Sequence, residues 1–259
     1  MAQMMSAVFT DLRSRLRFEP VRQQVRASYG GQMVAETTEA VLVWEPHSKI
    51  PAYAVPVRAI RVPMTTAPYR APAHLPELIG YADRGRVHGT DGRTVTLTVG
   101  TEVITDAGFI VDDPDLADLV VLRWSAFDWH EEGTPMIVHP QDPYVRISTR
   151  PSERHLVVEY RGTRLAETHR AVVLLETELP PRWYLPRDDL TPGLFVESST
   201  VTGCPYKGWA SYLSLREDRR GKDLAWYYPE PLPDAVPVAG MVSFWNERVT
   251  LLVDGEELR

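Results

Sequence analysis

The chain repeats the stretch Tyr29-Gly-Gly-Gln-Met-Val-Ala-Glu-Thr-Thr-Glu-Ala-Val-Leu-Val-Trp-Glu45 after an interval of 131 residues, as Tyr160-Arg-Gly-Thr-Arg-Leu-Ala-Glu-Thr-His-Arg-Ala-Val-Val-Leu-Leu-Glu176. No gap is needed to align the two. The identical pairs are Tyr29/Tyr160, Gly31/Gly162, Ala35/Ala166, Glu36/Glu167, Thr37/Thr168, Ala40/Ala171, Val41/Val172 and Glu45/Glu176. Self-similarity at a fixed interval is typical of repeated structural units. The chain is therefore predicted to be two diverged copies of one domain.

The repeat continues more weakly on the carboxyl side of this stretch. The same interval places Tyr53 over Tyr184, and Val87-His-Gly-Thr90 falls opposite Val201-Thr-Gly-Cys204. A proline-containing segment without apolar periodicity, residues 138–143, is typical of a linker. We predict an N-terminal helical segment at residues 1–17, a first copy at 18–139 and a second copy at 140–259.

The pattern within each copy favours β-structure. Tyr160-Arg-Gly-Thr163 indicates a tight hairpin turn, Ala171–Leu175 is a β-branched run of strand length, and Thr94–Val99 alternates with period two. Helix is predicted only at Ser6–Leu16 and briefly around Arg187–Leu190. The predicted fold class is mainly β, with a short N-terminal helix.

Composition restricts the classes of function. The chain is 44% hydrophobic and 24% charged with a net charge of −7, as expected of a globular protein whose surface is not a basic nucleic-acid platform. No apolar run approaches the roughly 20 residues of a membrane-spanning helix. A single cysteine, Cys204, excludes an intramolecular disulfide and suits a reducing cytoplasm. The seven histidines are scattered, so neither a metal site nor a cofactor is predicted.

One region of the second copy concentrates side chains capable of binding. It contains Thr202-Gly-Cys-Pro-Tyr-Lys-Gly-Trp-Ala-Ser-Tyr212, preceded by Trp183-Tyr-Leu-Pro-Arg-Asp-Asp189 and followed by Ala225-Trp-Tyr-Tyr-Pro-Glu-Pro-Leu-Pro233. Aromatic rings form apolar walls, and hydroxyls with a cation orient an anionic or carbonyl-bearing ligand. The predicted ligand-binding residues are Tyr184, Arg187, Cys204, Tyr206, Lys207, Tyr212, Trp226 and Tyr228. The alternatives are that these rings are core and turn packing, or that Cys204 and Lys207 act in catalysis.

The Cys204-Pro-Tyr-Lys-Gly208 run, with its upstream Tyr-x-Pro and downstream aromatic-proline segment, resembles the family catalogued as domain of unknown function 427. The resemblance covers Leu156–Glu256 and implies a small fold of the β-tent type, in which two antiparallel sheets meet at an angle. Related folds place small ligands or peptide ends in the crevice between sheets. One label attached to the family suggests nucleotidyl transfer. In the first copy, Thr90-Asp-Gly-Arg-Thr94 stands opposite the motif, so the site is expected in the second copy alone.

Two functions from different classes remain open at this point. The first is a binding module for a small molecule or peptide, with an aromatic crevice in the second copy. The second is an enzyme that uses Cys204, Lys207 and an acid such as Asp188 or Glu230, or a metal-dependent nucleotidyltransferase. The paired acids Asp188-Asp189 point to opposite sides of an extended strand, which disfavours two-metal chemistry. We expect a monomer in which the copies pair about a pseudo-twofold axis, or a weak homodimer.

Overall fold

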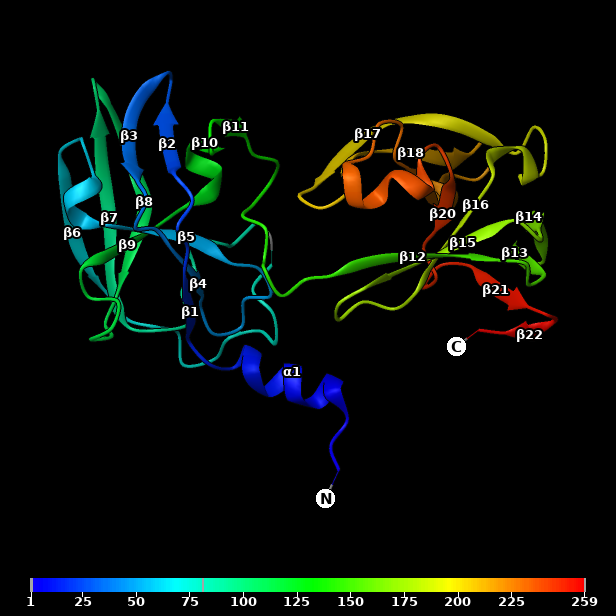
Figure 1. Ribbon diagram of the computed structural model, residues 1–259, viewed down its shortest axis with the longest axis horizontal. Coiled ribbons are helices and arrows are strands. Elements are labelled where there is room, and N and C mark those ends of the chain that lie inside the picture. The colour runs from blue at the N-terminus through cyan, green and yellow to red at the C-terminus, as the bar shows by residue number, and fades with distance from the viewer. Residues whose placement is uncertain (1, 81, 259) are drawn as a thin grey trace. The chain divides into compact units, whose positions relative to one another are not determined.

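The computed structural model describes residues 2–80 and 82–258, and the chain forms two compact units, Met1–Asp142 and Pro143–Arg259. Among the described residues the strands form four antiparallel sheets, one large and one small in each unit (Figure 1). This confirms the mainly β fold. The α-helix of the described chain is α1 (Met5–Arg13), which buries none of its side chains.

In the first unit, the large sheet has seven described strands. In spatial order they are β1 (Arg17–Pro20), β4 (Val41–Trp44), β5 (Ala52–Pro56), β9 (Leu119–Leu122), β8 (Glu102–Val111), β7 (Gly92–Val99) and β6 (Met64–Tyr69). The small sheet consists of β11 (Thr134–Pro135), β10 (Asp128–Glu131), β2 (Val25–Tyr29) and β3 (Gln32–Thr37). Two 3-10 turns, η1 (Val57–Ala59) and η2 (Trp124–Ala126), follow β5 and β9.

The second unit has the same strand order, with each strand number raised by eleven. Its large sheet is β12 (Ile147–Ser152), β15 (Ala171–Glu176), β16 (Arg182–Leu185), β20 (Val242–Phe244), β19 (Ala225–Tyr227), β18 (Gly208–Leu215) and β17 (Phe195–Cys204). Its small sheet is β14 (Thr163–Thr168), β13 (Leu156–Tyr160), β21 (Thr250–Val253) and β22 (Glu256–Glu257). The 3-10 turns are η3 (Arg187–Asp189), which confirms the predicted short helix, η4 (Arg219–Gly221) and η5 (Pro233–Val238).

Irregular backbone features also recur at equivalent places. The β2–β3 pairing shifts register between Ala27 and Ser28, and the β13–β14 pairing shifts between Val158 and Glu159, 131 residues later. His47 and Glu178, which follow β4 and β15, both have a positive φ, of 64° and 63°. Non-glycine residues rarely adopt this conformation. The correspondence between the units therefore extends from strand order to individual residues.

The strand registers correct two details of the predicted alignment. Ala54 pairs with Val41 in the first unit, whereas Tyr184 pairs with Val172 in the second, so the counterpart of Tyr184 is Ala54 and not Tyr53. Through the same ladders, Thr94 pairs with Phe109 and Tyr212 with Trp226. Residues 90–94 therefore do not stand opposite the Cys204–Gly208 turn. The longer connection between β6 and β7, residues 70–91, takes its place.

Each large sheet has two buried faces, because side chains alternate along a strand. The inner face packs against the small sheet of the same unit; in the first unit, Leu42 and Leu122 lie there with Val25 of β2. The outer face carries a separate cluster, which includes Val43 and Val121 in the first unit. The outer-face cluster of the second unit includes buried residues of η5 and most of the predicted binding residues.

Candidate functional site

The outer face of the second large sheet gathers four of the predicted binding residues into one aromatic cluster. Tyr184 lies on β16, Tyr212 on β18, Trp226 on β19 and Tyr228 directly after β19. These strands are neighbours or near neighbours, and their side chains alternate between faces. All four side chains are buried, with exposed fractions between 1% and 8%. The rings are therefore packed as an outer-face core and are not a crevice wall open to solvent.

Hydrogen bonds between polar tips fix the orientation of these rings. The Trp226 Nε1–H donates to the Tyr184 hydroxyl at 3.1 Å, and the two rings meet edge to face with centroids 6.4 Å apart. The Tyr212 hydroxyl is 2.8 Å from Thr202 Oγ1 on β17. Burial raises the pKa of the Tyr184 hydroxyl and of the Tyr228 hydroxyl far above the ordinary value. Both hydroxyls are therefore protonated at neutral pH.

Lys207 brings a positive charge to this cluster. Its Nζ lies 2.6 Å from Glu176 Oε2 at the end of β15, and the two side chains are only 10% and 11% exposed. The turn that carries Lys207 is fixed to the segment after β19, since the Leu232 N–H donates to the Lys207 carbonyl at 3.1 Å. Gly208 follows with φ +95°, and a Cβ there would lie 3.2 Å from the Glu230 carbonyl oxygen. The Lys-Gly pair thus directs the lysine inward.

The remaining predicted residues are placed differently. Cys204 is half-buried and packs at the border of the aromatic cluster, and Tyr206 is half-buried in the turn. Arg187 is exposed, pairs with Glu197, and lies with its guanidinium carbon 4.9 Å from the centre of the Tyr227 ring. Tyr227 packs with the inner-face core, because it is one residue from Trp226 and from Tyr228 along the strand. Arg187 is therefore not part of the outer-face cluster.

Asp188 and Asp189, the paired acids considered for an enzymatic function, lie away from the aromatic cluster. Asp189 accepts hydrogen bonds from Thr168 and Arg170, which places it against β14, and Asp188 is exposed. Within residues 2–80 and 82–258, no three His, Cys, Asp or Glu side chains are grouped so that they could hold a metal ion.

Glu176 and Arg182 belong to the cluster but were absent from the predicted residues. Arg182 stacks on Trp226 and on Trp245 at 5.6 and 5.7 Å, and its guanidinium bonds Glu247 at 2.8 Å. A signal for Glu176 was present in the sequence, because Glu45/Glu176 closes the repeated stretch. Only the fold reveals that this acid faces Lys207.

The first unit keeps a similar pair with a different cation. Glu45, the counterpart of Glu176, holds His88 from the long β6–β7 connection, with Nδ1 at 2.9 and 3.0 Å from its two carboxylate oxygens. His88 is 1% exposed and stacks on Phe109 with ring centroids 3.7 Å apart. The repeated glutamate thus receives a buried nitrogen group in both units.

Comparison with known proteins finds one family match, and it lies in the second unit. Residues 148–255 match the model of the family described as "Domain of unknown function (DUF427)". The resemblance based on the Cys-Pro-Tyr-Lys-Gly run is therefore confirmed. No curated protein matches the chain. Among the described residues, no helix is both long and apolar enough to cross a membrane.

Proposed function

We propose that the chain is a tandem pair of binding modules, and that the second unit binds a small molecule or peptide end carrying a carbonyl or carboxylate group. The observation that carries the proposal is the hydrogen bonding of Lys207. An ammonium group has three N–H donors, and among the described residues Lys207 has one acceptor, Glu176. Buried polar groups normally have partners, so the remaining donors call for a ligand or ordered water.

The outer-face cluster contains a second donor. The Tyr228 hydroxyl is protonated, is close enough to Glu176 for the carboxylate to raise its pKa further, and has no hydrogen-bond acceptor among the described residues. Lys207 is paired with Glu176, and Tyr228 belongs to the outer-face cluster that surrounds this pair. N–H and O–H donors in such a desolvated region are suited to a carbonyl or carboxylate oxygen.

The surroundings of these donors supply apolar contact. Tyr184, Tyr212 and Trp226 enclose the polar groups, while the half-buried Cys204 and Tyr206 border them. Small-molecule sites are typically apolar with a few placed polar groups. A buried ion pair contributes little net stability, because the cost of desolvating both charges offsets their attraction. This favours a role in recognition for Lys207 and Glu176.

The matched strand orders support a duplicated module. The first unit preserves the repeated glutamate but has residues 70–91 in place of the Cys204–Gly208 turn. The second unit alone matches the family pattern at that turn, and we therefore assign the binding role of the motif to it.

The proposal is tested by a thermal-shift screen of small carboxylates, amides and short peptides, followed by calorimetric titration of the hits. Tyr228→Phe removes one donor without leaving a cavity, and is expected to weaken a true ligand roughly 10- to 100-fold, as for a hydrogen bond to a charged group of about 1.5–3 kcal/mol. Tyr227→Phe is the matched control, because the neighbouring hydroxyl faces the other side of the sheet and bonds Glu197. Hits that bind Tyr228→Phe and the parent chain equally would show that the cluster is packing only.

A further inference from the structure

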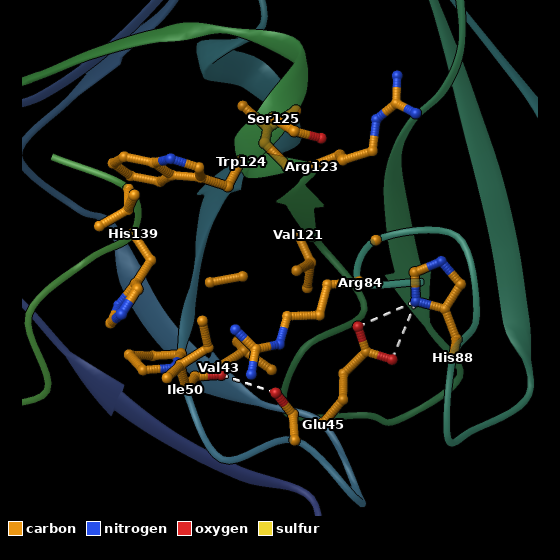
Figure 2. Close-up of a pocket in the computed structure, with 16 residues that line it drawn as sticks. Val43, Glu45, Ile50, Arg84, His88, Val121, Arg123, Trp124, Ser125 and His139 are labelled. Atoms are coloured by element: carbon orange, nitrogen blue, oxygen red, sulfur yellow. Dashed lines mark hydrogen bonds and ion pairs between the residues drawn. The ribbon is translucent and has the colours of Figure 1, made fainter. Parts of the chain in front are cut away.

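A hollow of about 80 Å³ lies on the outer face of the large sheet in the first unit (Figure 2). Its floor is formed by side chains of β4, β5 and β9, including Val43, Ala52 and Val121. The β6–β7 connection contributes Arg84, and Trp124 forms a further wall. A water molecule needs roughly 10–15 Å³ of such space, so the hollow has room for a group of several atoms.

On this face, β5 carries small side chains where the second unit has large ones. The strand registers place Ala54 where the second unit has Tyr184, and Ala52 two residues earlier where it has Arg182. In the second unit, Arg182 stacks on Trp226 and fills the outer face. In the first unit, the position of Arg182 is occupied by Ala52, whose short side chain lines the hollow. The sequence difference between the units therefore exchanges a packed face for an open one.

The charge of the lining is predominantly positive. Arg84 and Arg123 are the lining cations, whereas the lining carboxylate, Glu45, is engaged through both oxygens by His88. Figure 2 shows the Arg84 guanidinium reaching toward Val43 and Ile50, and the Arg123 guanidinium directed away from them. Burial, and then the charge of Arg84, lower the pKa of His139 on the opposite wall, so this imidazole is neutral at pH 7. A cation facing apolar walls in a concave site attracts anions.

We propose that this hollow binds a small organic carboxylate, with the carboxylate on Arg84 and the apolar body against Val43, Val121 and Trp124. The planar guanidinium matches a carboxylate through two parallel N–H···O bonds. The apolar floor suits a short hydrocarbon or aromatic body better than a fully polar anion such as inorganic phosphate. The site is separate from the Lys207 cluster, and lies in the unit for which the sequence predicted none.

The test is titration calorimetry of the full chain with butyrate and benzoate, against butyramide and benzamide as uncharged controls. The carboxylates are expected to bind at least tenfold more tightly than the amides. Arg84→Gln is expected to weaken carboxylate binding at least tenfold, and Ala52→Leu to abolish it by filling the hollow. Arg86→Gln is the matched control, since Arg86 lies on the same connection, is exposed and does not line the hollow.

The outcomes separate this site from the one proposed in the second unit. Tyr228→Phe should leave butyrate and benzoate binding unchanged, while Arg84→Gln should leave ligands of the Lys207 cluster unchanged. Thermal unfolding of each variant shows whether it is folded. Because Arg84→Gln and Ala52→Leu act independently, the test remains valid if one of them does not fold. Carboxylate binding that survives both Arg84→Gln and Ala52→Leu, no binding at millimolar concentrations, or tighter binding of phosphate than of benzoate would each overturn the proposal.

Discussion

At the scale of single residues, the Lys207–Glu176 pair connects stability with the candidate site. Each partner is about nine-tenths buried, so each charge depends on the other. Lys207→Met is expected to cost about 3–5 kcal/mol of unfolding free energy, because it strands a buried carboxylate. The double variant Lys207→Met with Glu176→Gln should recover most of that loss while still abolishing ligand binding. Urea denaturation measures the energies. Equal destabilisation of the single and double variants would contradict this account of the pair.

Buried tyrosines determine the response of the second unit to alkali. Burial raises the pKa of Tyr184 and of Tyr228 in the folded state, whereas an unfolded tyrosine ionises near pH 10. Below pH 10 both states are protonated and the stability is at its full value. Above pH 10 the unfolded chain loses protons that the folded chain retains, so stability falls as the pH rises. We expect the tyrosinate absorbance of these residues to appear together with loss of near-ultraviolet circular dichroism. Ionisation that precedes unfolding would show the hydroxyls to be accessible. Tyr228→Phe should shift the transition to higher pH.

At the scale of elements, the β17–β18 turn positions the Lys207 side chain, and the conformation of this turn depends on Gly208. Alanine at this position combines the strain of φ +95° with a Cβ 3.2 Å from a backbone oxygen that cannot move freely. Gly193 has φ +80°, and a Cβ added there would meet no atom within 4 Å. Substitution of Gly193 therefore measures the backbone strain without a steric clash. Gly193→Ala is expected to cost about 1 kcal/mol, and Gly208→Ala distinctly more, within the roughly 1–3 kcal/mol range of backbone strain. Chemical denaturation compares them. Equal costs would mean that the turn relaxes and that Glu230 does not constrain it.

The positions of the strands in the sequence were easier to predict than the way in which the strands pair and pack. Period-two alternation and the repeated stretch predicted strands such as β7 and β15, because burial on one face leaves a direct trace in the sequence. The convergence of Tyr184, Tyr212 and Trp226 was also anticipated. The structure places Arg187 outside this group, beside Tyr227, because strand pairing and the η3 turn determine the face that a residue after Pro186 occupies. The hollow of the first unit could not be predicted, because its lining combines β4, β5 and β9 with the distant β6–β7 connection, and because the position of Ala52 becomes informative only when the two registers are compared.

At the scale of the whole molecule, each unit contains its own complete core. The buried clusters of the second unit draw only on residues from Ile147 onward, and those of the first end at Met136. A domain of a little over 100 residues buries enough surface to fold alone. We therefore expect each unit to fold independently of the other.

This independence predicts that residues 143–259, produced without the first unit, fold cooperatively and retain the ligand affinity of the Lys207 cluster. The edge strand β12 provides the control, since its six residues pair with β15 and it packs against η5, which covers the aromatic cluster. A shorter chain that begins at residue 153 lacks β12 and is expected to lose cooperative unfolding, because the β15 edge and the outer face become exposed. Circular dichroism during urea denaturation distinguishes the two. If residues 143–259 unfold without a sigmoidal transition while the full chain shows one, the second unit draws its stability from the first, and the modules are not independent.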